Sequence, residues 1–319
     1  MSAAPAVARG TPRSGELVAD SRLPLVASAV AVFFWGLGPL IVVGITASTQ
    51  TIVLYRMLLG IPVMFVASLL FGDRITRATF RHALVPGILF GTSMILGFAA
   101  IRTTSIANAT LIGALVPAVV LLGAGRLVGE PPRLDKVPFA ALAIGGLALM
   151  VLSGSATSGA TLRGDLLAVV NLLLFTAYFL SVKKLRNAGV ESWSFLVAVF
   201  VVGSAVVAPW ALATSDDLGG FGAKDWLLLG SMVLGPGVVG HGLMTWTQRH
   251  LSLTTSSLMT LASPVVSTLG AWLVYDQRLA GLQLLGAAGV LAGLVGVVVD
   301  SRQRVTVAPA ASGGEPLVG

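Results

Sequence analysis

Ten apolar segments follow one another along this 319-residue chain, and each is long enough to cross a lipid bilayer as a helix. A membrane-spanning helix needs roughly 17 to 25 predominantly apolar residues. Inside a bilayer, only helices and closed barrels satisfy all their backbone polar groups. The sequence therefore predicts an all-α polytopic membrane protein with ten transmembrane helices, over residues 25–45, 51–71, 83–101, 105–123, 137–153, 165–182, 193–213, 226–248, 253–274 and 281–299.

The composition leaves little material for a soluble domain. Charged residues make up 10% of the chain, against roughly 25% in soluble domains. The N-terminal arm 1–24 and the tail 300–319 are short and rich in Ala, Pro, Ser and Gly, so we expect both to be disordered. The first apolar segment exceeds the roughly 7 to 15 residues of a signal-peptide core, so we expect it to be kept as a helix.

The placement of Lys and Arg predicts the orientation of the chain. Only four of the 20 basic residues lie in segments on the side away from the N-terminus, and Arg56 lies within a span. The other fifteen are on the N-terminal side, where the positive-inside rule places the cytoplasm, so we expect both termini to be cytoplasmic. A nucleic-acid surface would gather its charge on one folded face, so the net charge of +7 does not indicate a nucleic-acid partner.

A short element occurs twice in the chain. RTTSIANATLIGALVP at 102–117 returns as RHLSLTTSSLMTLASP at 249–264, and four identical residues keep an offset of 147 positions. Two five-helix repeats, 25–153 and 165–299, are thus predicted around an external connector 154–164. Because five is odd, the repeats cross the membrane in opposite directions, as in many secondary transporters. Duplication of the fold without transport is the alternative.

The architecture resembles the EamA-type transporters of the drug/metabolite transporter superfamily. The resemblance lies in the ten spans, Trp35-Gly36 in the first span, Arg56 early in the second, and Gly129-Glu130-Pro131 after the fourth. In the second half, Asp276-Gln277-Arg278 departs from the usual Gly-Glu. The resemblance implies an inner-membrane carrier for small metabolites, commonly amino acids or related compounds and often exported, with a central cavity between the halves.

Gly and Pro interrupt the third and eighth spans at corresponding positions. Such paired interruptions mark unwound segments whose backbone groups can meet a substrate. With the offset of 147, Ser93 corresponds to Gly240 and Met94 to His241, which makes these four residues cavity candidates. Close helix packing is the alternative explanation for each glycine. The predicted helix breaks are Pro86, Gly87, Gly91, Gly235, Pro236 and Gly237.

Polar and aromatic residues near the middle of spans complete the candidate cavity: Trp35, Arg56, Asn171 and Tyr178. No Asp or Glu lies clearly within a span, so His241 is the candidate for proton coupling, because its ordinary pKa is close to neutrality. The alternatives are a neutral His241 bonded to a neighbouring helix, core packing of Trp35, and an Arg56 side chain that extends to the membrane surface.

We therefore expect a secondary-active transporter that exports small metabolites by alternating access. A nucleotide-sugar or phosphate-sugar carrier of the same superfamily is the runner-up, although such anionic substrates favour several cavity Lys or Arg residues. A membrane-embedded enzyme would need a catalytic constellation that three His and no Cys do not supply. The expected partners are a small-molecule substrate and the bilayer, with no cofactor or metal. Coupling to protons or a counter-substrate, and a homodimeric state, stay open.

Overall fold

The computed structural model describes residues 22–104, 109, 112–122, 124–131, 133–154, 161–276 and 279–306. Within these residues the chain is helical, and nine stretches are long and apolar enough to cross a membrane. The expected fourth span, 105–123, lies partly outside them and contributes the short helix α5 (Val116–Leu121). Most of the predicted arm, tail and connector also lies outside the described residues.

The helices of the two halves follow the predicted order. The first half contains α1 (Leu23–Gly44), α2 (Thr49–Phe71), α3 (Arg77–Thr103), α5, the short η1 (Ala124–Val128) and η2 (Leu134–Lys136), and α6 (Val137–Gly154). The second half contains α7 (Leu162–Asn187), α8 (Ser192–Thr214), α9 (Ala223–Met232), the π-helical segment η3 (Val233–Gly240), α10 (His241–Thr247), α11 (Leu253–Met259), α12 (Ala262–Tyr275) and α13 (Gly281–Thr306).

Polar side chains set where several helices begin. An oxygen of Ser48, Thr76, Thr161, Glu191 or Ser252 accepts a hydrogen bond from a backbone N–H in the first turn of the next helix. These N–H groups have no partner within the helix itself, so each cap stabilises the start of a helix, typically by about 1 kcal/mol.

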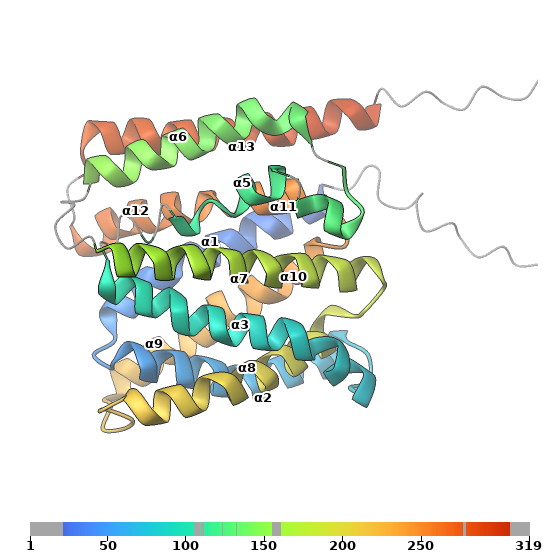
Figure 1. Ribbon diagram of the computed structural model, residues 1–319. Helices are drawn as coiled ribbons and strands as arrows, with labels where there is room; N and C mark the ends of the chain where they lie inside the picture. The colour runs from blue at the N-terminus through green and yellow to red at the C-terminus, as the bar shows by residue number, and fades with distance from the viewer. Residues whose placement is uncertain are drawn as a thin grey trace, which may run out of the picture.

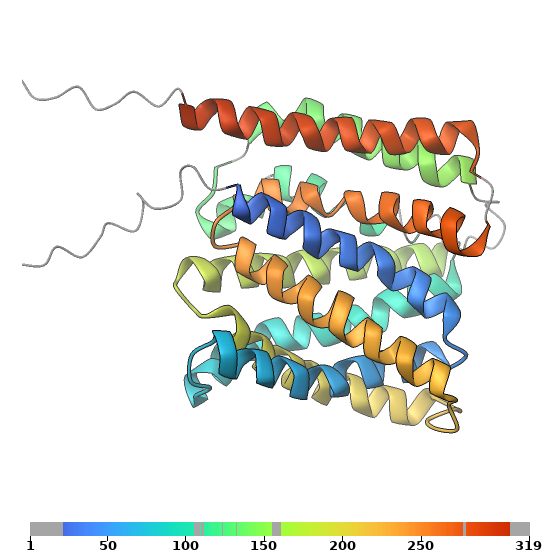
Figure 2. The same cartoon turned by 180° about the vertical axis from the view of Figure 1, so that it is seen from behind.

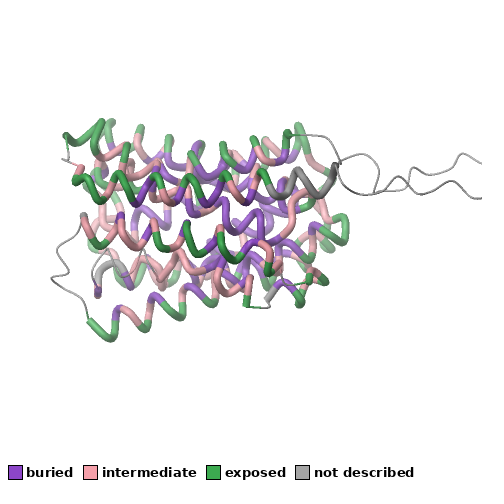
Figure 3. Tube along the Cα trace, turned by 90° about the horizontal axis from the view of Figure 1, so that it is seen from above, coloured by how far each residue is buried: buried purple, intermediate pink, exposed green. Residues whose placement is uncertain are grey.

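The helices run side by side in one bundle, with the α6–α13 pair along one edge and α2 and α8 along the opposite edge (Figures 1 and 2). The start of α1 and the last turn of α13 lie at the same end, which we call the terminal end; the opposite end is the far end. Buried residues concentrate inside the bundle and exposed residues outside (Figure 3). The outside carries large apolar side chains such as Leu69, Leu227 and Leu285, as a lipid-facing surface requires.

Two helix pairs show the two-fold relation between the halves. A methyl group added at Gly60 of α2 would lie 2.5 Å from the ring of Phe200, and one added at Gly203 of α8 would lie 2.6 Å from Met57. In α6 and α13, each of Gly146 and Gly286 lies against the carbonyl of the other. Reciprocal contacts of this kind are what a two-fold axis produces, so the fold consists of two inverted five-helix repeats.

The α2–α8 pair is also joined at its far end. The carboxylate of Asp217, in the loop after α8, accepts hydrogen bonds from Ser48 and Thr51 at the start of α2 and from Ser215. Partial burial raises the pKa of Asp217, but the hydrogen bonds outweigh this effect and lower the pKa to about 2. The carboxylate is therefore ionised at neutral pH and keeps these hydrogen bonds.

The predicted helix break in the third span is wrong. α3 is a continuous α-helix through Pro86, and methyl groups added at Gly87 and Gly91 would lie 2.6 Å from Val202 and 2.8 Å from the carbonyl of Gly203. These two glycines thus permit close packing on α8. In the eighth span the helix changes to π-helical geometry over Val233–Gly240, so Gly235, Pro236 and Gly237 mark a change in helix type.

Candidate functional site

A cavity of about 300 Å³ lies between α3, the fourth span and α7 in the far-end half of the bundle. Three of the predicted residues line it: Ser93 and Met94 from α3, and Asn171 from α7. Phe98 and Phe175 add aromatic walls. The volume is at the lower limit of small-molecule sites, which usually measure roughly 300 to 1,000 Å³.

The polar groups of this cavity have a defined orientation. Ser93 Oγ donates a hydrogen bond of 2.9 Å to Asn171 Oδ1, so the amide Nδ2 of Asn171 remains as a donor for a ligand. Gly97 makes room for this amide, because a methyl group there would lie 3.0 Å from Nδ2. The described residues that line the cavity carry no charge, so the cavity can hold an apolar group and one hydrogen-bond acceptor.

Arg56 and His241 form a second, deeper group. Arg56 Nη2 lies 3.2 Å from His241 Nε2, and the two residues are 9% and 5% exposed. The guanidinium group can only donate hydrogen bonds, so Nε2 is the acceptor and the imidazole is neutral with its proton on Nδ1. Arg56 therefore does not extend to the membrane surface, and His241 is hydrogen-bonded to a neighbouring helix.

Aromatic rings surround this pair and separate it from the cavity. The rings of Trp35 and Phe90 each lie 5.0 Å from the His241 ring, between centroids. Phe90 also lies 4.9 Å from Tyr178, whose ring is 5.8 Å from Phe175 in the cavity wall. The predicted residues thus fall into two neighbouring groups, with an aromatic layer between them.

Two buried donors in the deeper group make no hydrogen bond within the described residues: Arg56 Nε and Trp35 Nε1. An unpaired buried donor is costly, so both groups are available to a polar ligand or to water. Gly240 allows Trp35 to reach this position, since a methyl group there would lie 2.6 Å from Trp35 Cδ1. Gly240 is therefore a packing position next to the candidate site.

Two repeats, a cavity between helices of both halves and a buried Arg–His pair agree with the comparison with known families. The model of the EamA-like transporter family matches residues 23–152 and 162–299. The chain belongs to the EamA-like transporter family.

Further comparisons support the fold of this EamA-like chain. A crystal structure titled only as that of a protein matches with a TM-score of 0.73 and 18% identity, over 89% of this chain and 99% of that one. At this identity the match shows the fold alone. No curated protein matches the chain at a significant level.

The sequence did not single out every residue around the site of this EamA-like protein. Phe90, Phe175 and Phe200 are ordinary apolar residues in apolar spans, where composition carries no signal. Ser93 contacts Asn171, and its counterpart Gly240 lies against Ala31, so an offset of 140 relates α1 to α7. Phe175 could have been found through the repeat, because it is the counterpart of Trp35 at this offset and both residues border the site.

Proposed function

We propose that this EamA-like chain is a secondary-active exporter of small metabolites, such as amino acids or related compounds, working by alternating access. The observation that carries the proposal is an asymmetry between the repeats. Asn171 of α7 lines the cavity and is partly exposed, whereas Ala31, which stands 140 positions before it, is 0% exposed.

The same asymmetry appears in the paired spans. Gly97 and Phe98 line the cavity, and their counterparts with the offset of 147, Met244 and Thr245, are buried at 2% and 3% exposure. The structure is therefore more open in the far-end half than in the terminal-end half. Exchange of the two repeat conformations would reverse this difference, as alternating access requires.

The chemistry of the cavity supports a small substrate with few charges. The Asn171 amide can bind a carboxylate or carbonyl oxygen, and Phe98 and Phe175 can pack against an apolar part. Arg56 adds one fixed positive charge beyond the aromatic layer. A nucleotide sugar or phosphate sugar favours several cations, and the described cavity lining contains none.

The proposal predicts uptake in a purified system. Proteoliposomes should take up at least one labelled amino acid, measured with and without a pH gradient, and Asn171→Leu should raise the KM about tenfold, because it keeps the side-chain volume but removes the donor. Ser93→Ala is the matched control: it removes only the group that orients the amide, so a smaller increase is expected. Uptake equal to that of empty liposomes for every amino acid would contradict the proposed substrate class.

The orientation of the chain is a separate prediction. Basic residues of the described connections, including Arg74, Arg133 and Arg249, lie at the terminal end, so we propose that this end faces the cytoplasm. A reporter fused after residue 319 should be active on the cytoplasmic side, and one inserted into the 215–222 loop should be active outside. Activity of both reporters on the same side would refute the proposed topology.

A further inference from the structure

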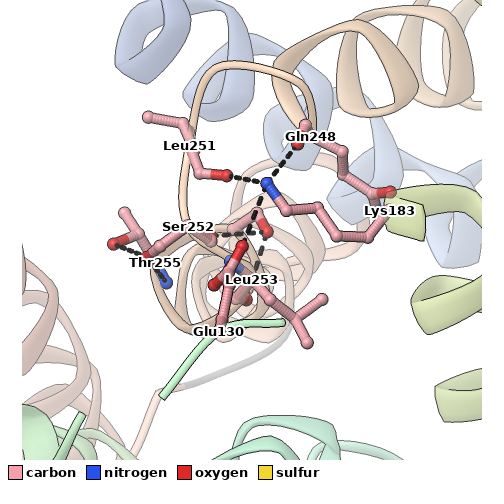
Figure 4. Close-up of polar contacts among 8 residues, drawn as sticks. Glu130, Lys183, Gln248, Leu251, Ser252, Leu253 and Thr255 are labelled. Atoms are coloured by element: carbon pink, nitrogen blue, oxygen red, sulfur yellow. Dashed lines mark hydrogen bonds and ion pairs between the residues drawn. The ribbon is translucent and has the colours of Figure 1, made fainter. Parts of the chain in front are cut away.

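A buried ion pair joins the two halves at the terminal end. Lys183 Nζ donates hydrogen bonds of 2.6 and 2.7 Å to the carbonyls of Gln248 and Leu251 and lies 3.1 Å from Glu130 Oε1 (Figure 4). Glu130 Oε2 accepts a hydrogen bond of 2.7 Å from the backbone N–H of Leu253. The side chains of Lys183 and Glu130 are 5% and 21% exposed, so water screens this pair less than a surface pair.

Glu130 is the member of this network that comes from the first half. It follows η1, whereas Lys183 lies in α7 and the other partners lie in the turn between α10 and α11. Lys183 closes the carbonyl end of α10, and Glu130 binds the amino end of α11, so each charge meets the favourable end of a helix. Separation of the halves at this end must break both contacts of Glu130.

The opposite end does not repeat this arrangement. Gly129 and Asp276 are 147 positions apart and both have positive φ, 80° and 51°, so they occupy the same turn in the two repeats. The residue after this turn is Glu130 in one repeat and Gln277 in the other. Lys183 corresponds to Val43 with the offset of 140 that relates α1 to α7. The repeat counterparts of Glu130 and Lys183 therefore cannot form the same charge pair at the far end.

We propose that Glu130 and Lys183 form a latch that keeps the terminal end closed and makes the far-end-open conformation the resting state. This inference rests on the proposed alternating access. Two repeats of the same fold have similar free energies in their exchanged conformations, so one additional contact in one conformation shifts the populations. The latch holds the repeats in the asymmetric arrangement in which Phe98 lines the cavity and Thr245 is buried.

Thr245 of α10 is a position whose exposure measures opening of the terminal end. It is 3% exposed, whereas its repeat counterpart Phe98, with the offset of 147, is partly exposed and lines the cavity. Opening of the terminal end should therefore expose position 245 and cover position 98. The chain contains no Cys, so a single cysteine at either position can be labelled without a background signal.

The test compares Thr245→Cys and Phe98→Cys, each with native Glu130 and with Glu130→Gln. Membrane vesicles of both orientations are treated with an impermeant maleimide, and the labelling rates are measured. With native Glu130, position 98 should react faster. Glu130→Gln should raise the labelling of position 245 at least about fivefold and lower that of position 98, as a coupling of this size implies.

Glu191→Gln is the matched control. It makes the same change at the same end, but Glu191 caps α8 within the second half and should leave both rates unchanged. If Glu130→Gln loses its monodisperse peak in detergent, Glu130→Asp, which shortens the carboxylate but keeps its charge, replaces it with the same expected direction. Unchanged rates in a folded variant, or a rise at both positions, would overturn the latch.

The assay separates this inference from the proposed function. Labelling needs no substrate, so a shift toward position 245 supports the latch even if no amino acid is transported. Conversely, active transport together with unchanged labelling in Glu130→Gln supports the proposed function and rejects the latch.

Discussion

Replacement of Arg56 by Met should lower the transport rate about 100-fold while the protein still folds. Arg56 is buried, holds His241 through a 3.2 Å contact and has an Nε donor without a hydrogen bond in the described structure. Met keeps much of the apolar stem but removes the charge, and loss of a charge-assisted, buried interaction costs about 3 kcal/mol. Initial uptake rates in proteoliposomes, normalised to the reconstituted protein, measure the effect.

Two companion variants separate charge from geometry. Arg56→Lys keeps the charge but not the planar group of donors, so a loss of about tenfold is expected.

His241→Gln keeps an acceptor for Arg56 but cannot titrate. If His241 carries the coupled proton, as expected from an ordinary pKa close to neutrality, this variant should bind substrate and lose accumulation driven by a pH gradient. Wild-type uptake in Arg56→Met would remove Arg56 from the site, and wild-type accumulation in His241→Gln would exclude that residue as the proton carrier.

Replacement of Gly146 by Leu should lower the free energy of unfolding by about 3 kcal/mol or more. A Cβ at this position would lie 2.6 Å from the carbonyl of Gly286 and 2.7 Å from the backbone nitrogen of Val290, so the α6 and α13 backbones must separate. Membrane helices associate through close packing of this kind, and backbone atoms cannot move aside as a flexible side chain can.

The neighbouring residue supplies the control. Gly145 has open space around its position, so Gly145→Leu makes the same change in the same helix and should leave stability nearly unchanged. The elution profile and the melting temperature in detergent measure both variants. Equal melting temperatures for the two variants would show that the α6–α13 contact does not limit stability.

The sequence predicted the general architecture because each span and each repeat leaves a local signal. Apolar length, Lys and Arg placement and the offset of 147 need no tertiary information. The Arg56–His241 contact could not be predicted in this way, because the residues are 185 positions apart and either could have met another partner. The ion pair of Glu130 and Lys183 was missed for the same reason, since both residues looked like ordinary charges at span ends.

The error at Pro86 and Gly91 has a different cause. Unwinding and close packing both favour residues without a side chain, so a Gly-rich span gives the same pattern for either outcome. A proline in a span also does not predict whether the helix breaks, because neighbouring helices can accommodate it within a continuous membrane helix. The local sequence therefore located the contact between α3 and α8 but not its nature.

The paired contacts of α2 and α8 limit which substitutions can change the direction of transport. Under the proposed alternating access, Gly60 with Phe200 and Met57 with Gly203 would exchange roles, so a change applied to both contacts would alter the two end states equally. Symmetric changes on this axis can then raise or lower the barrier between the end states, which sets turnover, but they leave the equilibrium in place. A preference for one side of the membrane must come from residues away from the axis, where one repeat has diverged from the other.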